Sequence, residues 1–272
     1  RVRQMALNME RWRWIPRDLG QRHVRVNVAS FSLLLHSGNG TDMRQRVIVG
    51  KTARRTPVFS DRITYAVFNP TWRVPRSIMV KDILPKVIKD PEYLKEHSMT
   101  LLSGWGEQAT EIDPESIDWE SVDPRAFPYR LRQEPGAHNA LGRIKFMFPN
   151  PFSVYLHDTP NKTLFDRTSR KFSSGCIRVE RPLDLAVALL AQDSKWDRQA
   201  LQAVLDQGQT KVITIAPSVP VHIFYWTAWV DERDQIHFRQ DIYDRDQKLR
   251  LALKERGARA GMGTERKIYG RQ

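Results

Sequence analysis

Cys176 and His157 are the two residues of this sequence whose side chains could act together on a carbonyl group. Cys176 is the only cysteine among 272 residues, it follows Ser173-Ser174-Gly175, and His157 lies nineteen positions upstream. A histidine within hydrogen-bond reach could take the thiol proton and later return it to a leaving group. Because glycine leaves the backbone free to turn, the N–H groups of Gly175 and Cys176 could point toward a developing oxyanion. The alternative for a lone cysteine is a small buried apolar residue.

The segments around these residues resemble the signature of the L,D-transpeptidases, a family of bacterial cell-wall enzymes. One part of the match is Tyr155-Leu156-His157-Asp158-Thr159-Pro160, the other is Ser173-Ser174-Gly175-Cys176-Ile177-Arg178, and blocks at 49–52, 69–75, 82–86 and 139–143 agree with them. Most members have histidine at position 174, and the serine form is similar to the large periplasmic branch with an extended lid. The resemblance runs from about Asn8 to about Tyr243, which is nearly the whole chain.

The resemblance implies a peptidoglycan L,D-transpeptidase. In that family the cysteine attacks the carbonyl between an L-centre and a D-residue of a tetrapeptide stem, and a thioester forms as D-alanine leaves. The side-chain amine of a second stem then attacks the thioester and creates a 3→3 cross-link. The resemblance further implies acylation by carbapenems, a periplasmic location, other cell-wall synthases as partners, and no cofactor.

The catalytic candidates are Cys176, His157, Gly175 and Asp158. The family's third catalytic element is often the backbone carbonyl after the histidine, which here belongs to Asp158. The Asp158 carboxylate could instead orient the ring as in a catalytic triad, or it could cap the turn before Pro160. These three possibilities remain open at the level of sequence.

The candidates for substrate binding are Tyr155, Arg178, Ser174, Trp72 and Asn139. Tyr155 would share a strand face with His157 and could form a wall of the acyl pocket. Arg178 could bind a stem carboxylate or form a buried structural pair. Trp72 could close over the donor stem or belong to the core of the lid.

Other functions fit the same residues. With water as acceptor the site would be an L,D-carboxypeptidase or an endopeptidase, and with a lipoprotein lysine it would be an anchoring enzyme, since the acceptor depends on pocket shape and exclusion of water. The second alternative is a non-catalytic cell-wall binding module that uses a basic surface.

The remaining sequence must position these residues. Alternating or continuous apolar residues at 23–36, 46–49, 63–68, 211–215, 221–230 and 235–239 predict strands. Leu183 to Leu190 and a capping box at 194–197 predict two helices directly after the cysteine. We therefore expect an α+β fold that is mainly β, and by resemblance a β-sandwich with this helical pair behind the motif.

A long segment between Phe68 and Arg143 shows no clear strand pattern. It contains Trp72, Trp105 and Trp119, and these tryptophans argue against disorder. So long a connection is usually a functional lid if it is ordered, so we predict a folded lid at about 69–142.

The chain divides into three predicted parts. Residues 1–20 form a junction helix, over Met5 to Trp14, from an upstream domain that this fragment lacks. Residues 21–253 form the catalytic domain with its lid, and residues 254–272 form a basic, disordered tail.

Charge and composition exclude several classes of function. The formal net charge of +13 comes partly from the two ends, and no zinc-finger, aromatic RNA-binding or helix-turn-helix pattern accompanies it. We therefore expect an anionic cell envelope rather than nucleic acid as the basic surface's partner. No apolar stretch is long enough for a signal peptide or membrane span, and the histidines lack metal-ligand spacing, so neither a span nor a metal is expected in this fragment.

Overall fold

One large sheet carries the motif residues in the computed structural model, which describes residues 1–38, 40, 42–104 and 108–268, with side chains described up to residue 256. The strand order is β11-β3-β12-β10-β9-β4-β13-β1-β2, and β2 also pairs with β3, so the sheet closes on itself. Its strands are β1 His23–Asn27, β2 Ser32–His36, β3 Met43–Gly50, β4 Phe59–Phe68, β9 Ile144–Met147, β10 Leu156–His157, β11 Lys171–Ser173, β12 Ile177–Val179 and β13 Lys211–Phe224.

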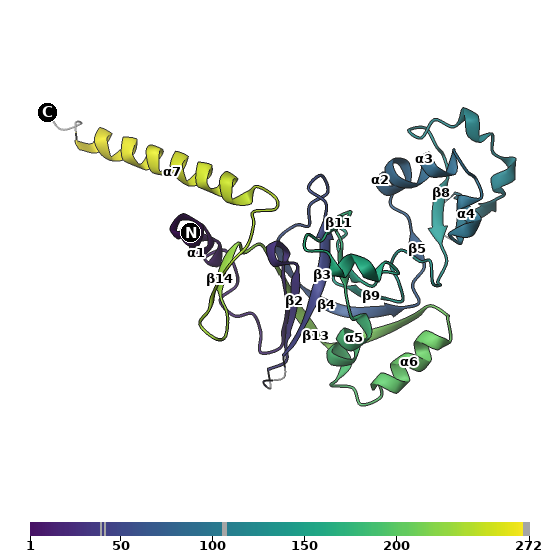
Figure 1. Ribbon diagram of the computed structural model, residues 1–272, viewed down its shortest axis with the longest axis horizontal. Helices are drawn as coiled ribbons and strands as arrows, with labels where there is room; N and C mark the ends of the chain where they lie inside the picture. The colour runs from purple at the N-terminus through teal and green to yellow at the C-terminus, as the bar shows by residue number, and fades with distance from the viewer. Residues whose placement is uncertain (39, 41, 105–107, 269–272) are drawn as a thin grey trace.

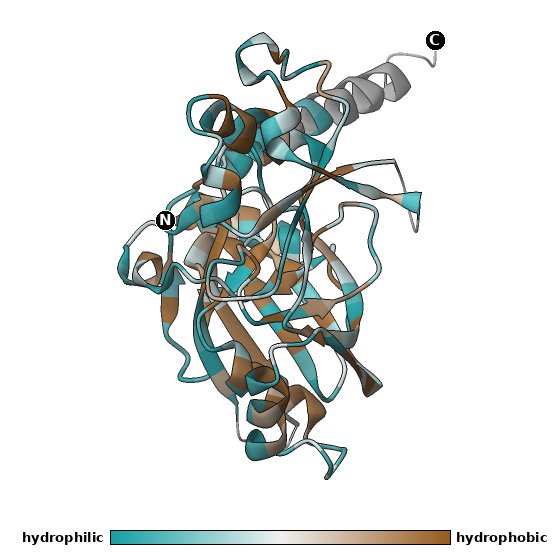
Figure 2. Ribbon diagram, turned by 90° about the vertical axis from the view of Figure 1, so that its right-hand side faces the viewer, coloured by the Kyte–Doolittle hydropathy of each residue, from teal (hydrophilic) through white to brown (hydrophobic). Residues whose placement is uncertain are grey.

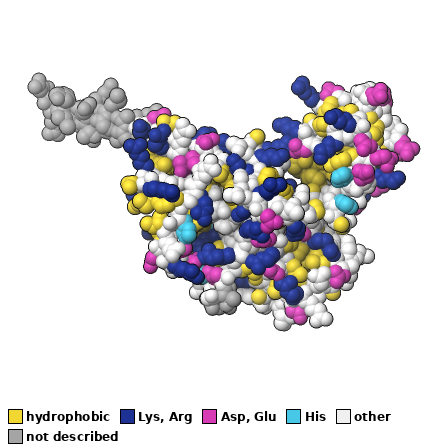
Figure 3. Space-filling view, in the orientation of Figure 1, with side chains coloured by type: hydrophobic (Ala, Val, Ile, Leu, Met, Phe, Trp, Pro, Cys, Tyr) yellow, Lys and Arg dark blue, Asp and Glu magenta, His cyan; other side chains and the backbone are white. Residues whose placement is uncertain are grey.

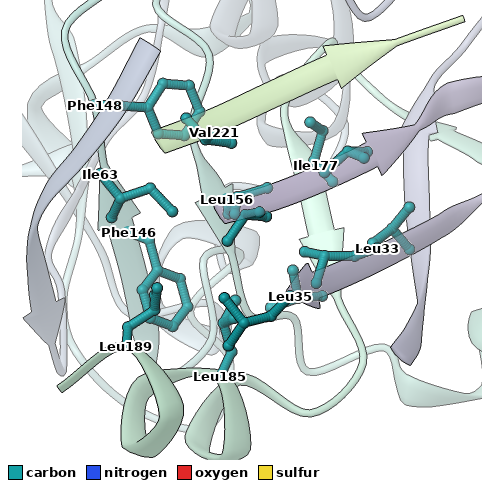
Figure 4. Packing of buried hydrophobic residues seen from close by; sticks show 14 of the residues in the cluster. Leu33, Leu35, Ile63, Phe146, Phe148, Leu156, Ile177, Leu185, Leu189 and Val221 are labelled. Carbon is teal, nitrogen blue, oxygen red and sulfur yellow. The ribbon is translucent and has the colours of Figure 1, made fainter. Parts of the chain in front are cut away.

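The core lies inside this closed sheet, because the strands alternate apolar and polar residues as period-two patterning requires. Figure 4 shows Leu156 and Ile177 pointing into this core, where Leu33, Phe146 and Leu185 also lie. Figure 2 shows polar and apolar residues interspersed along the central strands. The neighbours of Leu156 and Ile177 along their strands therefore face away from the core.

Two helices, α5 Pro182–Leu190 and α6 Arg198–Asp206, follow the cysteine motif and bury Leu185, Leu189 and Leu201 in the same core. This confirms the predicted helical pair and the mixed, mainly β fold class. The second helix begins later than predicted, because its cap is Asp197, whose carboxylate accepts a hydrogen bond from Ala200 N at 2.7 Å. The predicted strands 211–215 and 221–230 are also revised. They form one strand, β13, with an irregularity between Thr214 and Val219, and the chain then enters β14 Ala228–Val230.

A second, smaller sheet is formed by the segment between β4 and β9 of the main sheet. Its order is β5-β8-β6-β7, with β5 Trp72–Arg73, β6 Met99–Ser103, β7 Thr110–Ile112 and β8 Arg130–Gln133. Short helices surround it: α2 Arg76–Ile78, η2 Met79–Ile83, α3 Leu84–Val87, α4 Tyr93–Glu96, η4 Pro114–Ser116 and η5 Trp119–Ser121. Figure 1 shows these elements gathered on one side of the main sheet, connected to it through β5.

This segment, which we call the lid, has a hydrophobic cluster of its own that includes Leu84, Leu101, Trp119 and Leu131. Tyr155 packs against both this cluster and the main core. Four strands run through this segment, although the sequence shows no clear strand pattern there, because each strand is too short to show alternation. Trp105 lies outside the described residues.

The two ends of the chain pack together. Helix α1 Val2–Trp12 lies against β14, where Thr227 N donates to Asn8 Oδ1 at 3.0 Å, and Arg11 pairs with Asp246 at 2.5 Å. β15 Ile236–Phe238 pairs with β14, and α7 Arg245–Ile268 follows. The backbone from residue 254 to Ile268 is helical, where we expected disorder. Ala, Lys, Glu and Arg in this stretch favour helix, whereas its three glycines do not. None of the helices in the described part of the chain is long and apolar enough to cross a membrane.

Candidate active site

The registers of three neighbouring strands place the motif residues together. β10 pairs in parallel with β12, so that His157 lies opposite Arg178, and it pairs with β9, so that His157 lies opposite Lys145. Cys176 immediately precedes β12, where Ile177 N donates to Tyr155 O at 3.1 Å. Because Leu156 and Ile177 face the core, the residues beside them line the other face of the sheet.

A cavity of about 1220 Å³ lies between this face and the lid. Cys176, His157, Tyr155, Lys145 and Arg178 line it from the sheet. The lid and its connections contribute Trp72, Ile78, Met99, Gln133 and Leu141 among others. In Figure 3 the molecule is hollowed between the lid and the main body, and Lys and Arg side chains are spread over the face beside this hollow. Among the described residues, no cluster of three His, Cys, Asp or Glu side chains could hold a metal ion.

The Cys176 thiol is partly buried beside Tyr155. Its Sγ donates to the Ser153 carbonyl at 3.7 Å. Burial raises the pKa of the thiol, while hydrogen bonding with Tyr155 and the positive charges of Lys145 and Arg178 act in the opposite direction. Burial and the neighbouring Cys176 raise the pKa of Tyr155, so its hydroxyl stays protonated and can donate a hydrogen bond. Tyr155 also interacts with the Trp72 side chain, which connects the thiol to the lid.

His157 is 5% exposed and held by the backbone. Its Nδ1 lies 2.5 Å from the Asp158 carbonyl oxygen. Burial lowers the pKa of His157 to about 3, and the positive charge of Arg178 contributes to this shift. The ring is therefore neutral near pH 7, and since a carbonyl only accepts, Nδ1 carries the proton and Nε2 is the nitrogen that can act as a base. The Leu141 backbone is a further hydrogen-bond partner of the ring.

His157 and Cys176 share the cavity without a direct hydrogen bond between them in the described part of the chain. The thiol is directed to the Ser153 carbonyl instead. Catalytic hydrogen bonds commonly tighten only when a substrate binds, so this geometry is compatible with transfer of the thiol proton to the ring.

The Asp158 carboxylate has a different role from its carbonyl. It accepts a hydrogen bond from Arg143 N at 2.8 Å and pairs with Lys162. Gly142, at φ +62°, lies so close that an added Cβ would overlap this carboxylate. The geometry thus favours the backbone carbonyl as the group that orients His157, and the carboxylate caps the 142–143 turn rather than the turn before Pro160.

The Ser-Gly-Cys turn is held by Ser173. Gly175, at φ +121°, donates its N–H to Ser173 Oγ at 3.1 Å, and its carbonyl accepts from Thr56 Oγ1 at 2.8 Å. Such a positive φ is readily adopted by glycine alone. The Cys176 N–H has no hydrogen-bond partner within the described residues. Of the two N–H groups predicted for an oxyanion hole, Cys176 N–H is thus the one available without rearrangement.

The substrate-binding candidates fall into two groups. Tyr155, Arg178, Ser174 and Trp72 line the cavity, although Trp72 is 9% exposed and also belongs to the lid cluster, so both of its predicted roles apply. Ser174 Oγ accepts from Arg54 Nη1 at 2.7 Å, and Arg54 pairs with Asp82 of the lid.

Asn139 is wrong as a substrate contact. Its side chain is 1% exposed, donates to the Pro70 and Glu134 carbonyls at 2.9 Å, and accepts from Leu141 N at 2.8 Å. A side-chain amide with these partners has little bonding capacity left for a ligand. Asn139 therefore fastens the two ends of the lid to each other.

Lys145 is the cavity residue that sequence reasoning missed. A signal for it was present, because Lys145 lies between the apolar residues Ile144 and Phe146, and period-two alternation places it on the face away from the core.

Comparisons with known proteins identify the family to which this chain is similar. Residues 21–214 match the family model for the YkuD L,D-transpeptidase catalytic domain. A Haemophilus influenzae protein, named provisionally as an L,D-transpeptidase, is 39% identical over 251 residues, covering 92% of this chain and 50% of that protein. The chain thus spans about half the length of this relative.

Two solved structures were compared as well. L,D-transpeptidase 3 from Mycobacterium tuberculosis gives a TM-score of 0.35 at 11% identity, over 75% of this chain and 61% of that chain. An L,D-transpeptidase from Mycobacterium smegmatis gives 0.32 at 8% identity, over 75% of this chain and 58% of that chain.

Proposed function

Because this chain belongs to the L,D-transpeptidase catalytic-domain family, we propose that it forms 3→3 cross-links between peptidoglycan stems through a thioester on Cys176. The observation that carries the proposal is the placement of Cys176 and a neutral, backbone-held His157 in one cavity beneath a folded lid. We also place this activity in the periplasm, where the stems are.

The first half-reaction acylates the cysteine. The thiol turns from the Ser153 carbonyl to His157 Nε2 and loses its proton there, and the thiolate attacks the carbonyl carbon of the L-centre in the donor stem. The negative charge that develops on the carbonyl oxygen is stabilised by the Cys176 N–H, with the Tyr155 hydroxyl close enough to the sulfur to serve as a second donor. His157 returns the proton to the departing nitrogen of D-alanine, and a thioester remains.

The second half-reaction transfers the acyl group to an amine. The side-chain amine of a second stem attacks the thioester, His157 accepts its proton, and the thiolate leaves and is reprotonated. The cavity of about 1220 Å³ exceeds the ~300–1000 Å³ of ordinary small-molecule pockets. Its size fits two stem peptides, and cover by the lid would limit hydrolysis of the thioester.

Product analysis tests this proposal. The purified chain and its Cys176→Ala variant are given a disaccharide-tetrapeptide, and products are followed by mass spectrometry. We expect the intact chain, but not the variant, to form a cross-linked dimer. In a separate incubation with a carbapenem, we expect an adduct on Cys176 of the intact chain. If tripeptide formed without dimer, the activity would be that of an L,D-carboxypeptidase rather than a transpeptidase. If neither a peptide product nor a carbapenem adduct formed, the result would favour a non-catalytic binding module.

A further inference from the structure

Lys145 and Arg178 flank His157 from the two neighbouring strands. One ladder pairs Lys145 with His157 and the next pairs His157 with Arg178, so the three residues form one row across β9, β10 and β12. Residues paired across a ladder point to the same face of a sheet. The two cations therefore stand on opposite sides of the base, and all three residues line the cavity with Cys176.

Neither cation has an acidic partner. Within the part of the chain that the structure describes, no carboxylate pairs with either one, and Arg178 Nε is a buried donor without a hydrogen bond. Lys145 lies over the Tyr155 ring, with Nζ 5.0 Å from its centroid. Burial lowers the pKa of both cations, because the charged form of each loses contact with water there. Buried charges in proteins are ordinarily paired, so this arrangement indicates an anionic ligand.

The rest of the cavity has the same electrostatic character. Lys51, Arg73, Lys81 and Lys86 also line it. Asp82 is the one carboxylate among the described lining residues, and it already pairs with Arg54. The cavity is thus cationic with its own carboxylate neutralised, which favours ligands that carry more than one negative charge.

We propose that Lys145 and Arg178 form a two-point carboxylate site that restricts donors to stems with two free carboxylates next to the scissile bond. One is the carboxylate of the leaving D-residue, which suits the bidentate fork of Arg178. The other is the carboxylate on the side chain of the acyl-donating residue, which Lys145 binds as a point charge. A carboxamide at either place removes the charge and turns N–H donors toward a cation, so amidated stems are poor donors. This inference deepens the proposed function and rests on it for the identity of the ligand.

A first experiment tests the anion site without any peptide. Cys176 is alkylated with iodoacetate or with neutral iodoacetamide, and the ratio of the two rates is compared with that of free cysteine. We expect the ratio to be raised in the intact chain and to fall about fivefold in Lys145→Met and in Arg178→Gln, because each substitution removes one charge near the reacting sulfur. Lys89→Met is the control: Lys89 is an exposed lid residue outside the cavity lining, so this substitution should change the ratio little. Circular dichroism and thermal unfolding show that each variant is folded.

The use of a ratio separates two roles of the cations. If Lys145 and Arg178 acted only on ionisation of the thiol, each substitution would slow alkylation by iodoacetate and by iodoacetamide equally, and the ratio of the two rates would stay constant. That result, or an equal fall in Lys89→Met, would overturn the two-point site.

A second experiment asks which stems are donors. Tetrapeptides with a free or amidated terminal carboxylate, and a free or amidated side-chain carboxylate, are compared by kcat/KM. We expect each amidation to lower kcat/KM about tenfold or more in the intact chain, and Arg178→Gln and Lys145→Met each to lose sensitivity to one of them. Equal turnover of acids and amides would overturn the inference while leaving transpeptidation intact. No turnover of any stem, with the alkylation ratio still raised, would contradict the proposed function and leave the anion site standing.

Discussion

The His157 ring and the Asp158 backbone are joined by a contact of 2.5 Å between Nδ1 and the carbonyl oxygen, while the Asp158 carboxylate binds the Arg143 N–H and Lys162. Asp158 thus contacts three residues through two different groups, its backbone carbonyl and its carboxylate. The orienting group is main chain, so substitution of the side chain leaves it in place.

Replacement of the Asp158 side chain should therefore affect stability more than chemistry. In Asp158→Ala the Arg143 N–H loses its acceptor, which costs about 1–3 kcal/mol in the free energy of unfolding. We expect kcat to stay within about threefold of wild type, since no transition-state contact is removed. Urea unfolding and single-turnover acylation measure the two effects, with Asp158→Asn as the variant that keeps an acceptor. A hundredfold loss of kcat in a folded Asp158→Asn would instead assign the orienting role to the carboxylate.

Burial of neutral His157 should make the protein less stable in mild acid. The pKa of His157 is about 3 in the folded chain, against an ordinary value of 6.5. Between these pH values the unfolded chain binds a proton that the folded chain does not, so stability falls as pH falls through this window. The loss from pH 7 to pH 5 amounts to about 2 kcal/mol for this group. Unfolding by urea at both pH values should show this difference in wild type, and it should be smaller by that amount in His157→Gln. An identical pH dependence in both proteins would rule out a buried neutral ring.

The Tyr155 hydroxyl should assist acylation. It interacts with both the Cys176 thiol and Trp72, so Tyr155→Phe removes a donor from the sulfur and from the nearby oxyanion. We expect acylation by a carbapenem to slow roughly tenfold to a hundredfold, with the fold preserved. Stopped-flow acylation and adduct mass report this. Tyr129→Phe, in the lid cluster, is a matched control that should acylate at the wild-type rate, and an unaffected Tyr155→Phe would remove the hydroxyl from the mechanism.

Gly142 should tolerate no side chain. It has φ +62°, and an added Cβ would overlap the Asp158 carboxyl group. Gly208 has a similar φ of +70° with nothing within 4 Å of an added Cβ, so Gly208→Ala isolates the cost of the backbone conformation. We expect about 1 kcal/mol for Gly208→Ala and at least about 3 kcal/mol for Gly142→Ala, in thermal or urea unfolding. Equal losses would show that the 142–143 turn moves away from Asp158 at little cost.

The sequence predicted those features that depend on local periodicity. The alternation of Val24, Val26 and Leu33 identified β1 and β2, and Pro182 with the leucines after it identified α5. The cysteine and histidine were recognised because their residue types carry the chemistry and their flanking motifs are specific.

Features that depend on contacts between distant residues were not predictable in the same way. The lid strands have only two to five residues each, which is too short for an alternating pattern to be detected in the sequence. Asn139 looked available for substrate, yet its partners at Pro70 and Glu134 are set by how the lid closes on itself. Lys145 and Arg178 lack acidic partners within the described part of the chain because the tertiary structure places no carboxylate beside them, and the sequence alone does not show this.

The triple pairing of β3 has a consequence for how the enzyme is made. β3 contacts β2, which precedes it directly, but also β11 and β12, which lie more than a hundred residues later. β1 likewise pairs with β13, which lies far along the chain, for example through Val24 and Val221. Pairings of such long range form slowly, because the intervening chain must be ordered first. The ring that supports the Cys176 turn is therefore complete only when β13 has paired with β1 and β4.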